Sequence, residues 1–191
     1  MKTKEIEKRL EKVLSEKRYK HVLRVRDKAI ELGKLYDLDL EKLEVAALLH
    51  DCAKENEETY LKKYREDFER LKKENPDPDM DNKKTLHCAL GRIVAEKEYG
   101  IEDPDILNAI QNHTSGRVGM SDFEKLIYLA DKTEDGRDYQ GVDEIRELSE
   151  KNLSKAIAKS IDNTLKYLID SGSLITGKVI EVRNYLIENE K

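Results

Sequence analysis

The chain has 191 residues and a formal net charge of −5 at pH 7, with 40% charged and 38% hydrophobic residues. This length suits one domain, and the acidic balance argues against nonspecific nucleic-acid binding as the main task. Because the chain has two cysteines, no apolar signal segment and no stretch near the ~20 residues of a membrane span, we predict a cytoplasmic protein without membrane or nucleic-acid partners.

Helical periodicity runs through the first half of the chain. Apolar residues three and four positions apart form three successive stripes: Ile6, Leu10, Val13 and Leu14; then Val22, Val25, Ala29, Leu32 and Leu35; then Leu40, Leu43, Ala46 and Ala47. A short helix is expected over Thr59–Lys73. The segment 74–84 combines prolines with Asn and Asp, which predicts a loop.

The second half continues in the same way. A helix over 86–99 is expected to end at Gly100, and the next, over 103–112, to begin with Asp103 as N-cap and Pro104 in its first turn. After a loop over 113–122, Ser121 or Asp122 caps a helix that runs through Ala130. A second loop covers 135–141, and three helical segments follow near 143–151, 153–170 and 177–189.

No alternating β pattern, fixed-period repeat or linker divides the chain. We therefore predict an all-α, single-domain helical bundle over residues 1–191. Its core is expected at about residues 18–170, with the N- and C-terminal helices packed on it.

All of the histidines and one aspartate lie on or beside the apolar stripes of different predicted helices: His21, His50, His87, His113 and Asp131. A single histidine in such a place is usually a hydrogen-bonded core residue. Four together, with Asp51 and Asp131, favour a metal site in the core of a helical bundle.

His50 and Asp51 are neighbours, so on a helix their side chains point about 100° apart. Both can still reach an ion seated against the end of that helix, which would compensate for burying them. Imidazole with carboxylate favours Fe, Mn, Zn, Co or Ni over Mg. Since imidazole must be neutral to bind, metal affinity is expected to fall in acid.

The ordered set of His21, His50–Asp51, His87, His113 and Asp131 resembles the HD-domain superfamily of metal-dependent phosphohydrolases. The segments HDCAK, HTSGRVGMS, EKLIYLAD and EDGRDYQGV look like its YqeK-type branch, and the resemblance covers roughly residues 18–187. It implies an HD-type helical bundle. It also implies symmetrical hydrolysis of diadenosine tetraphosphate to two ADP, with iron as the preferred metal.

The resemblance implies that a first ion is held by His21, His50, Asp51 and Asp131. His87 and His113 would either hold a second ion, with Asp51 bridging, or face the substrate phosphates, and the two-ion version is slightly favoured. The cofactor is thus one or two divalent transition metals, with Mn, Co, Ni and Zn as alternatives to Fe. Asp51, His87 and His113 are the expected catalytic residues.

The polyphosphate needs further positive charge and hydrogen-bond donors. Lys54 lies three residues beyond Asp51, and Arg117 and Arg137 lie in loops that follow ligand-bearing segments. Thr114 offers a hydroxyl directly after His113. Because the chain has 36 Lys and Arg, a solvated surface charge is the alternative for each basic residue.

Other interpretations stay open at this point. With the same metal centre the substrate could be a nucleoside triphosphate, a deoxynucleotide or a guanosine alarmone, and a nonenzymatic nucleotide-sensing module is a third alternative. A homodimer is also left open. Cys52 and Cys88 each follow a histidine of the set, and small buried filler is favoured over a redox-linked pair.

Overall fold

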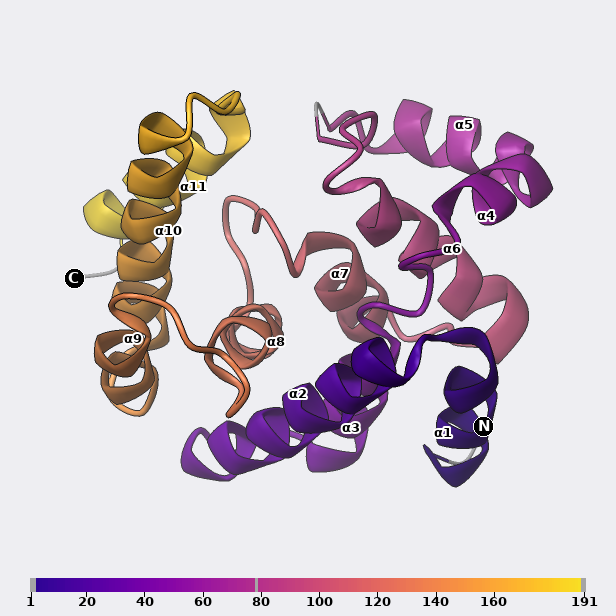
Figure 1. The fold of residues 1–191 in the computed structure, drawn as a ribbon, viewed down its shortest axis with the longest axis horizontal. Coiled ribbons are helices and arrows are strands. Elements are labelled where there is room, and N and C mark those ends of the chain that lie inside the picture. The colour runs from indigo at the N-terminus through magenta and orange to yellow at the C-terminus, as the bar shows by residue number, and fades with distance from the viewer. Residues whose placement is uncertain (1–2, 78, 190–191) are drawn as a thin grey trace.

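The computed structural model describes residues 3–77 and 79–189, and in these ranges it is built of helices and connecting loops (Figure 1). The helices are α1 (Thr3–Val13), α2 (Glu16–Leu35), α3 (Leu40–Leu49), α4 (Glu57–Lys63), α5 (Arg65–Glu74), α6 (Leu86–Tyr99), α7 (Pro104–Asn112), α8 (Asp122–Thr133), α9 (Val142–Ser149), α10 (Leu153–Asp170) and α11 (Gly177–Asn189). The predicted all-α class is confirmed. Pro78, within the predicted loop, lies outside the described residues.

No helix in the described ranges is long and apolar enough to cross a membrane.

Several predicted helix ends are confirmed by local hydrogen bonds. Asp103 accepts backbone N–H groups of the first turn of α7, which begins at Pro104. Gly100 ends α6 with a φ of +67°, a conformation that glycine adopts without steric penalty. Ser121 is the N-cap of α8 and forms a reciprocal capping box with Glu124.

The predicted single helix over Thr59–Lys73 is wrong, because the chain breaks at Tyr64 into α4 and α5. The Tyr64 hydroxyl donates a hydrogen bond of 2.9 Å to Glu98 on α6. The break redirects α5 so that Phe68 and Leu71 are buried. The burial of these two side chains outweighs the local continuity of the helical pattern.

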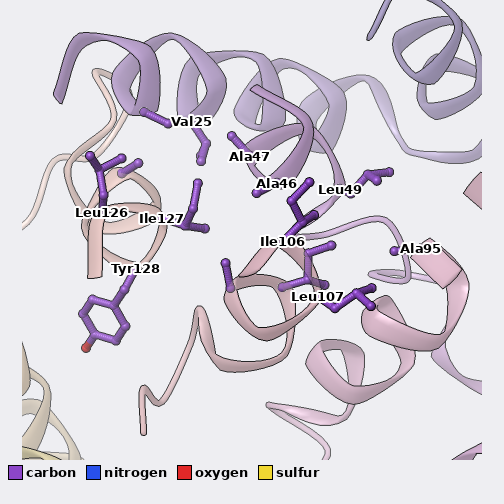
Figure 2. Close-up of a cluster of buried hydrophobic side chains, with 14 of the residues drawn as sticks. Val25, Ala46, Ala47, Leu49, Ala95, Ile106, Leu107, Leu126, Ile127 and Tyr128 are labelled. Atoms are coloured by element: carbon purple, nitrogen blue, oxygen red, sulfur yellow. The ribbon is translucent and has the colours of Figure 1, made fainter. Parts of the chain in front are cut away.

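The hydrophobic core lies between α2, α3, α7 and α8. Figure 2 shows Val25, Ala46, Ala47, Ile106 and Ile127 converging there from these helices. Burying this apolar surface is the main favourable term in folding. The core therefore fixes the ends of α3 and α7, where three of the predicted metal ligands follow.

Two glycines allow helices to approach closely. A Cβ atom on Gly33 of α2 would lie 2.4 Å from Leu43 Cδ1 of α3, so these helices run side by side (Figure 1). A Cβ atom on Gly91 of α6 would lie 3.1 Å from Ile110 Cγ2 of α7 and 3.6 Å from the carbonyl oxygen of His50. A larger residue at either position would push apart helices that carry predicted ligands.

The terminal helices pack on the rest of the fold. Ile6 and Leu10 of α1 are buried, as are Val182 and Leu186 of α11. Helices α9, α10 and α11 lie on one side of α8, and α4, α5 and α6 lie on the other side of the molecule (Figure 1). That the chain forms one folding unit stays a prediction.

Candidate metal centre

The six predicted ligands lie together and are buried: His21 on α2, His50 and Asp51 directly after α3, His87 on α6, His113 directly after α7 and Asp131 on α8. Their imidazole rings form a row. Ring centroids are 5.4 Å apart between His21 and His50, 5.0 Å between His50 and His113, and 5.2 Å between His113 and His87. The fold thus gathers donors that span more than a hundred residues of sequence.

The Asp51 carboxylate sits between the two ends of this row. Its Oδ2 atom is 3.9 Å from His21 Nε2 and 3.7 Å from His50 Nε2. Its Oδ1 atom is 3.4 Å from His87 Nε2 and 3.5 Å from His113 Nε2. We call His21, His50, Asp131 and Asp51 Oδ2 the first donor set, and His87, His113 and Asp51 Oδ1 the second donor set.

Hydrogen bonds fix the orientation of the imidazoles in the first donor set. His50 Nδ1 lies 2.6 Å from the Ala47 carbonyl oxygen, and His21 Nδ1 lies 3.1 Å from Glu134 Oε1. Both oxygens are acceptors, so each Nδ1 carries the proton and each Nε2 presents a lone pair. Among the described residues, neither buried Nε2 atom has a hydrogen-bond partner.

His21 Nε2 also lies 3.1 Å from Asp131 Oδ1, so two electron-pair donors face each other. The donor atoms of His21, His50 and Asp131 are all within 4.8 Å of one another. A proton or a metal ion between them would remove the repulsion of two acceptors this close. The residues of the first donor set therefore fit a divalent transition metal, which accepts imidazole and carboxylate ligands together.

In the second donor set, only one of the two imidazoles is oriented to bind an ion. His113 Nδ1 donates to the Ile110 carbonyl oxygen at 2.8 Å, so its Nε2 lone pair faces inward. The Lys54 ammonium, which has only donors, lies 2.8 Å from His87 Nδ1. His87 accepts there and carries its proton on Nε2. His87 can bind an ion through Nε2 only after Lys54 moves away.

The electrostatics of His50, Asp51 and Asp131 favour the protonation states that metal binding requires. Burial lowers the pKa of His50 to about 4, which keeps its imidazole neutral at pH 7. Burial alone would raise the pKa of Asp51, but the imidazoles of His50 and His113 hold it well below its usual value. Burial opposes ionisation of Asp131 in the same way, and the Lys132 ammonium holds its pKa low.

Cationic side chains surround the two carboxylates. Arg18 Nη1 donates to Asp51 Oδ2 at 2.7 Å, and Arg137 Nη2 donates to Asp131 Oδ1 at 2.5 Å. Sequence reasoning missed Arg18. The available signal was its position three residues before His21, which places both on one face of α2. Within the described part of the chain, the buried Arg18 Nε has no hydrogen-bond partner.

Glu134 was also missed, although it lies one turn beyond Asp131. Its carboxylate accepts from His21 and from the Arg24 guanidinium. Arg146 holds the following loop by donating to the carbonyl oxygens of Glu134 at 3.1 Å and Arg137 at 2.8 Å. Glu134 thus orients His21, and Arg146 positions the segment that carries Arg137.

The Glu134→Gln variant is expected to weaken metal binding by about 10- to 100-fold, the usual effect of losing an outer partner of a ligating histidine. Glutamine keeps the shape of Glu134 but lacks the charge that increases the basicity of His21. Isothermal titration of the metal-free protein with Mn(II) would measure the change. The exposed Glu16→Gln variant is the control, and equal affinities in the two variants would contradict the role of Glu134.

The predicted phosphate-binding residues have different surroundings. Lys54 contacts His87, Arg137 contacts Asp131, and Thr114 Oγ1 is 3.5 Å from His87 Nε2, so all three border the centre. Arg117 instead forms a two-point ion pair with the buried Glu124, at 2.7 and 2.6 Å. That pair anchors the loop before α8. A phosphate contact by Arg117 stays a prediction.

Comparison with known proteins identifies a family and relatives of this chain. Residues 18–136 match the family model for the HD domain. The chain is 37% identical to a Bacillus subtilis protein named bis(5'-nucleosyl)-tetraphosphatase, symmetrical, over 91% of each chain. It is 39% identical to a Staphylococcus aureus protein of the same name, covering 90% of this chain and 88% of that one.

A solved structure shows the same fold. It is described as a predicted HD superfamily hydrolase involved in NAD metabolism, from Clostridium acetobutylicum. The two structures superpose with a TM-score of 0.87 at 43% sequence identity, covering 98% of this chain and 97% of that chain.

Proposed function

Because this chain belongs to the HD domain family, we propose that it hydrolyses diadenosine tetraphosphate symmetrically to two ADP, with one ion in each donor set. HD domains bind divalent metals, and the centre has histidine and aspartate groups able to hold them. The observation that carries the proposal is the Asp51 carboxylate, which faces two imidazoles through each of its oxygens. Relatives named for this reaction align over nine-tenths of the chain.

Divalent ions bound here would supply Lewis acidity to the polyphosphate and lower the pKa of water from 15.7 to roughly 7, so that a nucleophile is available at neutral pH. Imidazole and carboxylate donors favour Fe, Mn, Co, Ni or Zn. Among these we propose iron, which the resemblance to the YqeK-type branch implies, with the others as alternatives. The chain's own contribution is to hold the donors apart at fixed distances and to keep the carboxylates ionised.

Three basic side chains would bind the phosphates. Arg18 and Arg137 each contact a ligand carboxylate at its outer edge, so their remaining N–H groups can meet phosphate oxygens. Lys54 must leave His87 when that imidazole binds an ion. We propose that its ammonium then turns to the polyphosphate, which places a positive charge beside the bond that breaks.

A cavity beside the centre offers room for one nucleoside. It has a volume of about 650 Å³ and is lined in part by Lys132, Tyr139, Asn163 and Tyr167. Lys132 connects it to the first donor set, since its ammonium is 3.0 Å from Asp131 Oδ2. Tyr139 and Tyr167 present aromatic surface on which a purine can stack.

The direct test incubates the protein with diadenosine tetraphosphate and Fe(II) without oxygen and separates the products by ion-exchange chromatography. The proposal expects ADP as the sole nucleotide product, at two per substrate consumed. ATP with AMP would show attack at a different phosphorus and contradict symmetrical cleavage. A parallel panel of a nucleoside triphosphate, a deoxynucleotide and a guanosine alarmone tests the alternative substrates.

The Arg18→Gln variant is expected to raise KM by about 10- to 100-fold. Hydrogen bonds to charged groups contribute about 1.5–3 kcal/mol, and each 1.4 kcal/mol is a factor of ten. Steady-state kinetics with diadenosine tetraphosphate would show the change. Arg92→Gln is a matched control, because Arg92 bonds to Asn108 and Gln111 instead, and an unchanged KM in Arg18→Gln would exclude a substrate contact.

A nucleotide as the binding partner accords with the names of the relatives. The cytoplasmic location and the homodimer stay predictions.

A further inference from the structure

Cys88 lies at the second donor set and not among apolar neighbours. Its sulfur is 3.4 Å from His87 Nε2, 3.9 Å from His113 Nε2 and 3.2 Å from Thr114 Oγ1. Donor atoms of His87, Cys88 and His113 are all within 4.8 Å of one another, and all three residues are buried. A thiol that serves only as filler needs no such polar surroundings.

Cys52 provides the contrast within the same chain. It lies two residues beyond the predicted ligand His50, yet its Sγ faces the Gly91 carbonyl oxygen at 3.5 Å. It is fully buried, and burial raises its thiol pKa. Cys52 therefore fits the filler interpretation, whereas the sulfur of Cys88 lies among the donor atoms of His87 and His113.

The second donor set is short of ligands without Cys88. It offers two imidazoles and one oxygen of Asp51, whereas the first set has two imidazoles, Asp131 and the other Asp51 oxygen. A thiolate at the position of Cys88 Sγ would bring the second set to four protein ligands. This matches the number in the first set.

We propose that Cys88 is a thiolate ligand of the ion in the second donor set, together with His87, His113 and Asp51. The inference rests on the two-ion part of the proposed function. When the ion binds, the S–H bond breaks, a sulfur–metal bond forms and the thiol proton is released to solvent. Once Lys54 has left His87, the imidazole proton is exchanged through solvent from Nε2 to Nδ1, which frees the Nε2 lone pair. A softer ligand set of this kind favours Zn, Fe and Co over Mg and Mn at the second set.

Cobalt spectroscopy tests this proposal without relying on turnover. Metal-free wild-type protein, Cys88→Ser and Cys52→Ser are each titrated with Co(II) under reducing conditions. A near-ultraviolet thiolate-to-cobalt charge-transfer band is expected in wild type and in Cys52→Ser, and is expected to be lost in Cys88→Ser. Circular dichroism and thermal melting of the metal-free variants check that the fold is retained.

A second measurement keeps the proposal testable if Cys88→Ser binds cobalt poorly. The affinity of the second site for Cd(II), divided by that for Mn(II), is expected to fall about tenfold or more in Cys88→Ala, the scale on which supporting groups affect metal sites. An unchanged ratio would contradict the proposal. So would wild-type protein that binds cobalt without the charge-transfer band, or a band that persists in Cys88→Ser.

Different results would contradict the proposed function and the proposed role of Cys88. Formation of two ADP by a wild-type protein that lacks the charge-transfer band would overturn the role of Cys88 and leave the proposed function intact. A cobalt protein with the Cys88-dependent band but no turnover of diadenosine tetraphosphate would support the ligand and overturn the function.

Discussion

The Asp51→Asn variant is expected to lose stable binding of metal ions at both donor sets. Its turnover of diadenosine tetraphosphate is expected to fall by more than about 100-fold. Loss of an outer partner alone costs a metal site about 10- to 100-fold, and Asp51 belongs to both inner sets. Asparagine keeps the volume and one carbonyl oxygen. It removes the negative charge that would balance two cations in the buried site.

Thermal melting of the same variant should distinguish a loss of metal binding from a loss of folding. An ion present at 100 times its dissociation constant stabilises a fold by about 2.7 kcal/mol, and 1 kcal/mol shifts Tm by roughly 2–4 °C at this chain length. Wild-type Tm should therefore rise by about 5–11 °C for each such ion added. The Asp51→Asn variant should melt cooperatively, and its Tm should rise little when metal is added.

Metal content by mass spectrometry, thermal melting and steady-state kinetics would be compared in wild type, Asp51→Asn and Asp162→Asn. Asp162 is the control because it pairs with Arg183 in the contact between α10 and α11. Near-wild-type turnover in Asp51→Asn would show that the carboxylate does not bridge the two sets.

The His113→Gln variant is expected to keep the ion of the first donor set and lose the one of the second. Turnover should fall by about 100-fold or more, since a displacement of 1 Å at a reacting centre already costs about that much. His113 is suited to this test because its Nδ1 bond to the Ile110 carbonyl oxygen aims Nε2 at Asp51.

The metal content shows whether the second donor set holds an ion or faces the substrate phosphates. If His113 holds an ion, wild type binds two ions per chain and His113→Gln binds one. If His113 instead faces substrate phosphates, both proteins bind one ion and only the kinetics change. Equal metal content would therefore contradict the two-ion arrangement.

The sequence predicts the helical class and most helix ends because these depend on local patterns. Gly100, Asp103 and Ser121 act as caps through bonds to residues within a few positions. The break at Tyr64 could not be predicted in this way. It depends on a hydrogen bond to Glu98, on a helix 34 residues away.

The same distinction between local patterns and long-range contacts applies to the residues of the metal centre. Five of the six predicted ligands could be singled out because each is a polar residue on or beside an apolar stripe, and Asp51 because it directly follows His50. Arg18 and Glu134 were missed because each looks like an ordinary charged residue of a helix end until the fold brings it beside Asp51 or His21. Arg117 looked free in its loop, but Glu124 seven residues later is its partner.

The central claim is that the Asp51 carboxylate lies between two ions. Anomalous diffraction from a crystal of the Fe- or Mn-loaded protein tests it most directly. The account predicts two anomalous peaks, one among His21, His50 and Asp131 and the other beside His87 and His113, with Asp51 between them. A single peak remote from Asp51, or imidazoles that bond only to protein atoms in a protein shown to contain metal, would contradict it.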